Sequence, residues 1–114
     1  MAWNSTSLES ILAMILAVLF AIAGVVNLAR PGAVKRDFAR WGYPAWFQLL
    51  CGALELLSAA LLPAQQTRVY GLTLASTIII GALLTLVRNR EPFRHLAPAL
   101  IFSALIVVTL AARG

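Results

Sequence analysis

The amino-acid sequence predicts an all-α membrane protein, in which four transmembrane helices form a bundle and a short amphipathic helix lies at the membrane surface. Of the 114 residues, 61% are hydrophobic and only 11% are charged, whereas soluble domains usually have about 45–50% apolar residues. The few charges separate four long apolar runs, each close to the ~20 residues that cross the hydrocarbon core of a bilayer. A single domain over residues 1–114 is expected, because the four spans use nearly the whole chain.

Capping and proline residues set the limits of the first two expected spans. The first is predicted at residues 7–29, because Thr6 and Glu9 match a capping box at a helix start. The second is predicted at residues 44–62, because a proline fits its first turn and Pro63 prevents the helix from continuing.

The last two expected spans lie at residues 68–87 and 93–112. A short polar turn separates the third span from the second, and residues 69–87 of the third carry no charge. In the fourth, Pro92 suits the start of a helix, so Pro98 would lie inside it and bend it. A start at Pro98 would instead leave too few residues to cross the membrane comfortably.

The segment at residues 32–41 differs from the apolar runs, because its hydrophobic residues fall on one helical face. Val34, Phe38 and Trp41 recur at i, i+4 and i+7, which is the spacing of an amphipathic helix on a membrane surface. Gly42 is expected to end this helix. The residues expected to meet the lipid headgroups are Lys35, Arg36, Arg40 and Trp41.

The positive charges predict an orientation and argue against a nucleic-acid partner. The net charge is +5, but the basic residues lie between apolar runs rather than on one soluble face. Seven of the nine Lys and Arg residues fall in two loops, at residues 30–41 and 88–94. By the positive-inside rule these loops face the cytoplasm and both termini lie outside it. The expected location is the lipid bilayer of a bacterial inner membrane.

No catalytic or metal-binding pattern is evident in the sequence. It has one cysteine and one histidine, too few for a Cys/His metal cluster. It also lacks a nucleophile–base pair, a Gly-rich phosphate loop and paired carboxylates. We therefore expect no bound metal, no cofactor that the residues themselves identify, and no enzyme activity from this chain alone.

Glu55 is the main candidate for function, because it is the only charged residue in the second expected span. A charge at that depth costs about 2.5–3.5 kcal/mol on insertion scales, so an intramembrane acid usually has a partner or a use. In its neutral form Glu55 would donate a hydrogen bond to a carbonyl, a quinone or an amide, or exchange a proton with a ligand. The structural alternative is a buried link to Asn27 or to a threonine of the third span.

Three of the expected spans carry polar or small residues at helical spacing, and we expect these faces to meet inside the bundle. Such stripes serve either as packing surfaces or as the walls of a polar cavity, and spacing does not separate the two. They are Gln48, Gly52, Glu55 and Ala59; Thr73, Thr77, Gly81 and Thr85; and Ala17, Gly24 and Asn27. The candidates for ligand binding or proton exchange are Glu55, Gln48, Asn27, Thr77 and Thr85.

Two motifs stand in the middle of the chain. One is the segment Asp37–Pro44, and the other is Gly52-Ala53-Leu54-Glu55. Together they resemble the pattern of the DoxX-like family of small four-helix membrane proteins. The resemblance places on motif positions Phe38, Gly42, Tyr43, Pro44, Gly52 and Glu55. It implies a compact four-helix membrane bundle, and the family's founding members are small subunits associated with a thiosulfate:quinone oxidoreductase.

Three functions are compatible with these observations. The resemblance and the central acid favour an accessory or anchor subunit of a membrane redox system, with a quinone as ligand and a membrane redox protein as partner. A small proton-coupled transporter of lipophilic compounds that uses Glu55 is the second hypothesis. A structural or lipid-organising protein that acts through the basic surface helix is the third. Self-association into a homo-oligomer is compatible with each of them.

Overall fold

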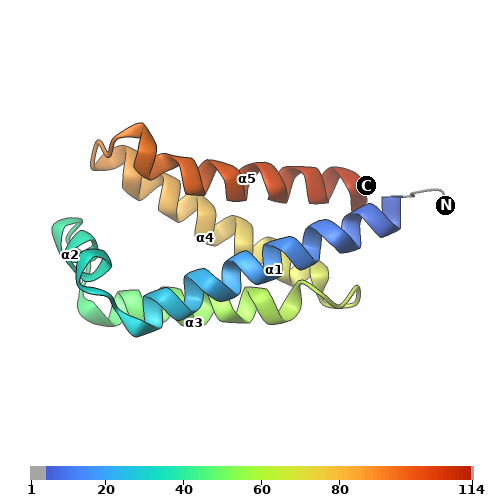
Figure 1. The fold of residues 1–114 in the computed structure, drawn as a ribbon, viewed down its shortest axis with the longest axis horizontal. Coiled ribbons are helices and arrows are strands. Elements are labelled where there is room, and N and C mark those ends of the chain that lie inside the picture. The colour runs from blue at the N-terminus through green and yellow to red at the C-terminus, as the bar shows by residue number, and fades with distance from the viewer. Residues whose placement is uncertain (1–4, 114) are drawn as a thin grey trace.

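The computed structural model describes residues 5–113, and the side chains from residue 7 onward. Within these residues the chain is all-helical, as predicted, and no strand is present. The five helices are α1 (Ser5–Ala29), α2 (Gly32–Arg40), α3 (Ala45–Leu61), α4 (Arg68–Arg88) and α5 (Phe93–Arg113) (Figure 1).

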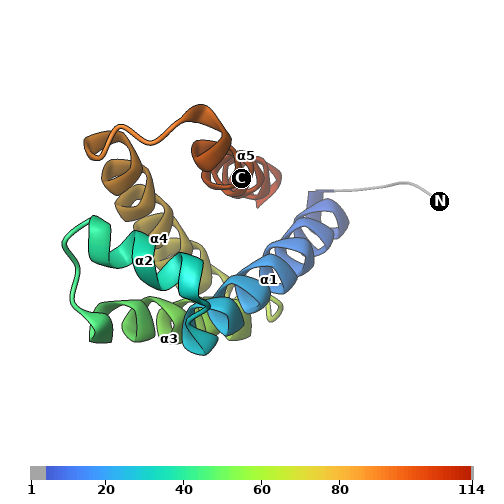
Figure 2. The same cartoon turned by 60° about the vertical axis from the view of Figure 1, so that its left-hand side comes forward.

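Each of the four long helices packs against two others: α1 and α4 both contact α3 and α5. A buried apolar cluster joins them, and it includes Leu16 and Phe20 of α1, Leu72 and Ile79 of α4, and Ile106 of α5. The start of α1 and the end of α5 lie at one end of the molecule, and α2 lies at the other (Figure 1). Seen from the α2 end, α2 covers the space between α3 and α4 (Figure 2).

Three helices are long and apolar enough to cross a membrane by themselves, and they correspond to three of the four predicted spans. They are Ser7–Ala29, Arg68–Arg88 and Phe93–Arg113. The last begins directly after Pro92 and contains Pro98, as the sequence predicts. Many of their large apolar side chains are exposed, as expected of helices that face lipid. The chain is therefore an integral membrane protein.

The remaining predicted span, at residues 44–62, is shorter than expected. The helix α3 has 17 residues, and it reaches the length of a span only together with α2, from which it is bent by 114°. A proline precedes α3, and Pro63 follows soon after its end, which limits the helix at both ends. The structure thus has three candidate spans, or four if α2 and α3 are taken as one bent span.

The turn between α2 and α3 has the geometry of a Schellman motif. The backbone N–H of Gly42 donates to the carbonyl of Ala39, and that of Tyr43 donates to the carbonyl of Phe38, both at 3.0 Å. Gly42 has a φ of 88°, a conformation that glycine adopts without steric cost. The predicted role of Gly42 as the helix end is therefore confirmed.

Two helices approach closely where Gly24 of α1 lies against Gly52 of α3. A Cβ atom added at Gly52 would lie 2.9 Å from the carbonyl oxygen of Gly24, and one at Gly24 would lie equally close to the carbonyl oxygen of Gly52. Only glycine at both positions allows this contact. The prediction that Gly52 permits close helix approach is confirmed.

A buried charge cluster holds the opposite end together. The guanidinium of Arg68 donates to Glu9 Oε2 at 3.0 Å, and that of Arg113 donates to the same oxygen at 2.9 Å. Arg68 is 2% exposed and also donates to the carbonyls of Leu62 and Pro63. This cluster links α1, α4, α5 and the α3–α4 turn. The other member of the predicted capping box, Thr6, lies outside the side chains described.

Candidate functional site

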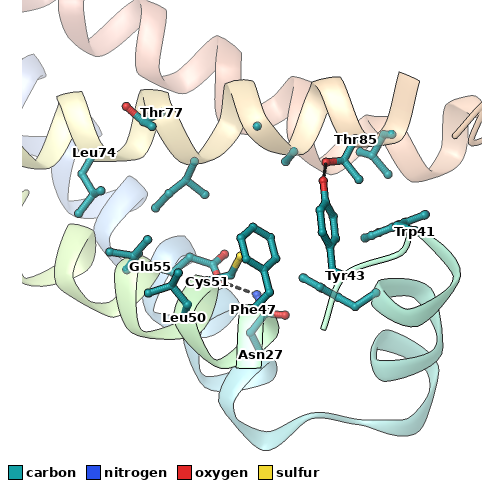
Figure 3. Close-up of a pocket in the computed structure, with 16 residues that line it drawn as sticks. Asn27, Trp41, Tyr43, Phe47, Leu50, Cys51, Glu55, Leu74, Thr77 and Thr85 are labelled. Atoms are coloured by element: carbon teal, nitrogen blue, oxygen red, sulfur yellow. Dashed lines mark hydrogen bonds between the residues drawn. The ribbon is translucent and has the colours of Figure 1, made fainter. Parts of the chain in front are cut away.

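A cavity of about 410 Å³ lies between α3 and α4, near the end that α2 covers (Figure 3). Its walls are mostly apolar, and they include Phe47, Leu50 and Leu54 of α3 and Leu74 and Ile78 of α4. A pocket of this volume, with few polar groups in an apolar wall, has the character of a site for a small lipophilic molecule.

The acid in the cavity wall has an amide partner from another helix. Glu55 is 7% exposed, and the Nδ2 group of Asn27 donates a hydrogen bond to its Oε1 atom (Figure 3). Both residues line the cavity. The other three acids of the sequence take part in ion pairs, whereas Glu55 has no cationic partner among the described residues. The arrangement suits a neutral acid, which needs no counter-ion in an apolar surrounding.

Two of the predicted stripes are buried except at half-buried Ala59 and Asn27, and the third is mostly exposed. In α3, Gln48, Gly52 and Glu55 are buried, and in α1 so are Ala17 and Gly24. In α4 the prediction is wrong for three positions, because Thr73, Thr77 and Gly81 are exposed. The face of α4 that packs instead consists of Gly71, Leu72, Ala75 and Ile79.

The threonine hydroxyls of α4 explain this difference. Thr73 donates to the carbonyl of Val69, and Thr77 donates to the carbonyl of Thr73. These bonds lie within one helix, so the hydroxyls need no partner on another helix. Thr77 still contributes to the cavity wall, and so does Gly81, beside which a Cβ atom would meet nothing within 4 Å.

Thr85 is the one residue of that stripe that is buried, and it is bonded to the turn between α2 and α3. Its Oγ1 atom lies 2.6 Å from the hydroxyl oxygen of Tyr43, in a hydrogen bond at the α2 end of the cavity (Figure 3). The ring of Tyr43 packs on Phe47 with 4.5 Å between ring centroids. This aromatic pair and the Tyr43–Thr85 bond lie at the α2 end of the cavity wall.

A model of the DoxX-like family matches residues 11–109. The chain belongs to the DoxX-like family. No curated protein and no solved structure matches the chain closely enough for comparison. Family membership therefore supports an integral membrane protein.

The motif residues of this DoxX-like protein have separate structural roles. Phe38 and Tyr43 line the cavity at its α2 end, and Gly42 makes the turn between them. Gly52 allows α1 to approach α3 closely enough for Asn27 to reach Glu55. The motif residues thus shape the α2 end of the cavity, bring α1 close to α3 and supply the acid.

The residue that holds α2 in place, Glu91, was not among the sequence candidates. Its carboxylate accepts a hydrogen bond from Trp41 Nε1 at 2.9 Å and forms ion pairs with Arg40 at 2.7 Å and with His95 at 2.8 Å. The hydrogen bond from Trp41, aided by those from His95 and the charge of Arg40, holds the pKa of Glu91 below its usual value. In the sequence, Glu91 stands out as the only acid in the basic loop at residues 88–94.

This contact changes the expected role of two surface residues. Trp41 is half-buried and lines the cavity, so it does not serve only as a membrane-surface anchor. Arg40 bonds to both Glu91 and Asp37. Lys35 and Arg36 are exposed, and their contact with lipid headgroups stays a prediction.

The described residues contain no group of three or more His, Cys, Asp or Glu side chains that could hold a metal ion. The groups that line the cavity offer neutral hydrogen bonds: the Asn27 amide, the Glu55 acid and the hydroxyls of Tyr43, Thr77 and Thr85. Such a site can bind and orient a lipophilic molecule and exchange a proton with it.

Proposed function

We propose that this DoxX-like protein binds a lipophilic, carbonyl-bearing molecule such as a quinone, as an accessory or anchor subunit of a membrane redox system. The observation that carries the proposal is the apolar cavity of about 410 Å³ with Glu55 and Asn27 in its wall. The association of the family's founding members with a quinone-linked oxidoreductase supports the choice of ligand class.

The chemistry follows from how the two polar groups share their atoms. Asn27 donates to Oε1 of Glu55, which is the hydrogen bond that this side chain makes within the described residues, and it leaves Oε2 available. If Glu55 is the neutral acid, Oε1 is the carbonyl oxygen and the Oε2 hydroxyl is directed to a ligand. A quinone or ketone oxygen would accept that hydrogen bond, and its hydrocarbon part would fill the apolar remainder.

Binding of a short-chain ubiquinone to the protein in lipid nanodiscs tests the proposal, with quenching of tryptophan fluorescence as the readout. We expect saturable quenching, because Trp41 lines the cavity. Glu55→Leu should weaken binding about 2- to 10-fold, the effect of one hydrogen bond. Glu55→Gln should keep most of the affinity, because an amide N–H can replace the acid as donor.

Two controls keep this test specific. Gly81→Leu places a side chain where no atom lies within 4 Å of a Cβ, so it should fill the cavity and abolish binding without disturbing helix packing. A hydrocarbon of matching size without a carbonyl should bind equally to the wild type and to Glu55→Leu. Non-saturable quenching, or equal quinone affinity in Glu55→Leu and the wild type, would contradict the proposal.

The partner protein, the four-span topology and the cytoplasmic side of the basic loops belong to the same proposal. Purification from native bacterial inner membranes in mild detergent, with mass spectrometry of co-purifying proteins and lipids, tests the partner. A stoichiometric redox protein supports an accessory subunit, whereas a homo-oligomer alone opposes it. Labelling of single cysteines placed at residues 35 and 64 from either side of the membrane tests the topology.

A proton-coupled transporter of lipophilic compounds is the second candidate, because Glu55 in the cavity wall has no cationic partner among the described residues to hold it in the charged form. Uptake of a lipophilic cation into proteoliposomes, driven by a pH gradient, separates the two functions. A transporter should lose uptake in Glu55→Gln, since the amide carries no exchangeable acid proton. Quinone binding should survive the same substitution.

A further inference from the structure

The wall of the cavity reaches the outer surface of the molecule between α3 and α4. Three of the residues that line the cavity are exposed, and all three belong to these two helices: Leu50 of α3, and Thr77 and Gly81 of α4. A Cβ atom added at Gly81 would meet nothing within 4 Å, so no neighbouring side chain covers this part of the wall. We call these three residues the portal residues.

The other residues that line the cavity are buried or half-buried. At the α2 end, the rings of Trp41 and Tyr43 pack on Phe38, with centroid distances of 5.4 and 6.2 Å. On the α1 side, half-buried Asn27 lies in the wall and bonds to buried Glu55. The portal residues are therefore the exposed part of the cavity wall.

The portal residues of α4 lie at the depth of the hydrocarbon core. This helix is long and apolar enough to cross a membrane, and it ends on the α2 side at Arg88, which opens a basic loop typical of an interface. Gly81 and Thr77 lie two and three turns before that end, or about 10 and 16 Å at a rise of 1.5 Å per residue. Because the hydrocarbon core is about 30 Å thick, acyl chains rather than headgroups surround these residues.

The chemistry of the portal residues suits a hydrocarbon chain. Leu50 and Gly81 have no polar side-chain group, and the hydroxyl of Thr77 already donates to the carbonyl of Thr73. An apolar chain can therefore lie against these residues without leaving a donor unpaired. The acid that would bind a polar head, Glu55, is buried away from the surface.

The volume of the cavity limits which part of a ligand it can enclose. About 410 Å³ lies near the lower end of the ~300–1,000 Å³ of small-molecule sites. This space suits a quinone ring with a short side chain. The polyprenyl tail of a membrane quinone has several times as many atoms as the ring, so most of it needs room outside the cavity.

We propose that the cavity takes a polyprenyl quinone laterally from the bilayer, with the ring beside Glu55 and the tail leaving past the portal residues into lipid. The inference rests on the proposed function and deepens it, because it selects, among lipophilic carbonyl compounds, those with a long hydrocarbon tail. A fully enclosed site would instead exclude ligands with such a tail.

Binding of two ubiquinones to the full-length protein in lipid nanodiscs tests the inference, one with two isoprene units and one with eight. Quenching of tryptophan fluorescence reports binding, and each affinity is expressed as a mole fraction of ubiquinone in the lipid. Partitioning of the long tail into the bilayer then does not count as affinity. We expect the two affinities to agree within about threefold, because the additional isoprene units stay in lipid in both the free and the bound state.

Two matched pairs of substitutions test the position of the portal. Thr77→Phe narrows it on α4, and Thr73→Phe is the control, because Thr73 is also exposed and bonded within its own helix but does not line the cavity. On α3, Leu50→Phe is compared with Leu49→Phe. These leucines are 42% and 40% exposed, and of the two only Leu50 lines the cavity.

The readout of these variants is the ratio of the long-tail affinity to the short-tail affinity, since a loss of cavity volume weakens both ligands. The ratio should fall about tenfold in Thr77→Phe and Leu50→Phe, which is within the range that overpacking of a tight contact produces. It should keep the wild-type value in Thr73→Phe and Leu49→Phe.

Two results would overturn the inference while the proposed function stands. One is a long-tailed ubiquinone that binds the wild type more than threefold more weakly than the short-tailed one. The other is a ratio in Thr77→Phe and Leu50→Phe equal to that of their controls. In both cases the short-tailed ubiquinone would still bind in a manner that depends on Glu55. Absence of saturable binding by either ubiquinone would overturn the proposed function, and the inference with it.

Discussion

The contact between Gly24 and Gly52 makes a specific prediction about stability. In Gly52→Ala the new Cβ atom would lie 2.9 Å from both the Gly24 carbonyl oxygen and Cγ of Leu28. The leucine can change its rotamer, but the carbonyl oxygen belongs to the backbone of α1 and is fixed by the helix. The two helices must therefore move apart, which also loosens the hydrogen bond between Asn27 and Glu55.

The size of the effect follows from two opposing contributions. Overpacking of a tight contact costs about 1–3 kcal/mol, and the higher helix propensity of alanine offsets up to about 1 kcal/mol. We expect Gly52→Ala to lower the free energy of unfolding by about 1–2 kcal/mol, or roughly ten-fold in the folding equilibrium. Gly81→Ala is the matched control, because its Cβ would meet nothing within 4 Å. It should be neutral or slightly stabilising.

Reversible unfolding in mixed detergent micelles with increasing SDS, followed by tryptophan fluorescence, measures both variants against the wild type. The order of stability should be Gly81→Ala at or above the wild type, and Gly52→Ala below it. If Gly52→Ala is as stable as Gly81→Ala, the close contact between α1 and α3 contributes nothing to stability and the prediction is wrong. Quinone affinity should fall with stability in Gly52→Ala, because the same contact places Asn27 beside Glu55.

Three further predictions concern the two ends of the molecule. Gly42→Ala should lower the free energy of unfolding by about 1–2 kcal/mol, because a φ of 88° is strained for a residue with a Cβ atom; SDS titration checks it. Arg68→Met should lower the free energy of unfolding by about 3–5 kcal/mol, because it leaves Glu9 buried with a weaker partner. Adding Glu9→Leu to this variant should recover part of that loss, and the same SDS titration measures both variants. Glu91 has a lowered pKa, so its contacts stabilise α2 docking above the unfolded-state pKa of about 4.3, and this stabilisation is lost as the pH falls through the lower folded-state pKa. Trp41 fluorescence should therefore change below about pH 4.3, and Glu91→Gln should abolish that titration.

Local signals in the sequence were sufficient to locate most helix limits. Pro92 precedes the last helix as expected, and Gly42 ends α2 with a positive φ. These residues restrict the backbone wherever they occur, so their effect can be read without tertiary structure. The pairing of Glu55 with Asn27 was also one of the alternatives that the sequence allowed, since the two residues lie on faces predicted to meet.

Features that depend on distant contacts could not be located in this way. Glu9 lies 59 residues from Arg68 and 104 residues from Arg113, and no local pattern connects them. The burial of α4 was misjudged for a different reason. Thr73 and Thr77 bond to carbonyls of their own helix, so a stripe of threonines does not by itself identify the packed face.

The two ends of the molecule explain why a cavity forms where it does. At one end, Arg68 ties the α3–α4 turn to α1, and Gly71 of α4 packs closely on the backbone of Leu62. From there α3 and α4 diverge toward α2 (Figure 1), and no large side chain occupies the space beside Gly81. The segment around α2 covers this space rather than filling it, and Glu91 attaches that cover to the α4–α5 turn through Trp41 and Arg40. The volume of the cavity should therefore depend on how firmly Glu91 holds α2 in place.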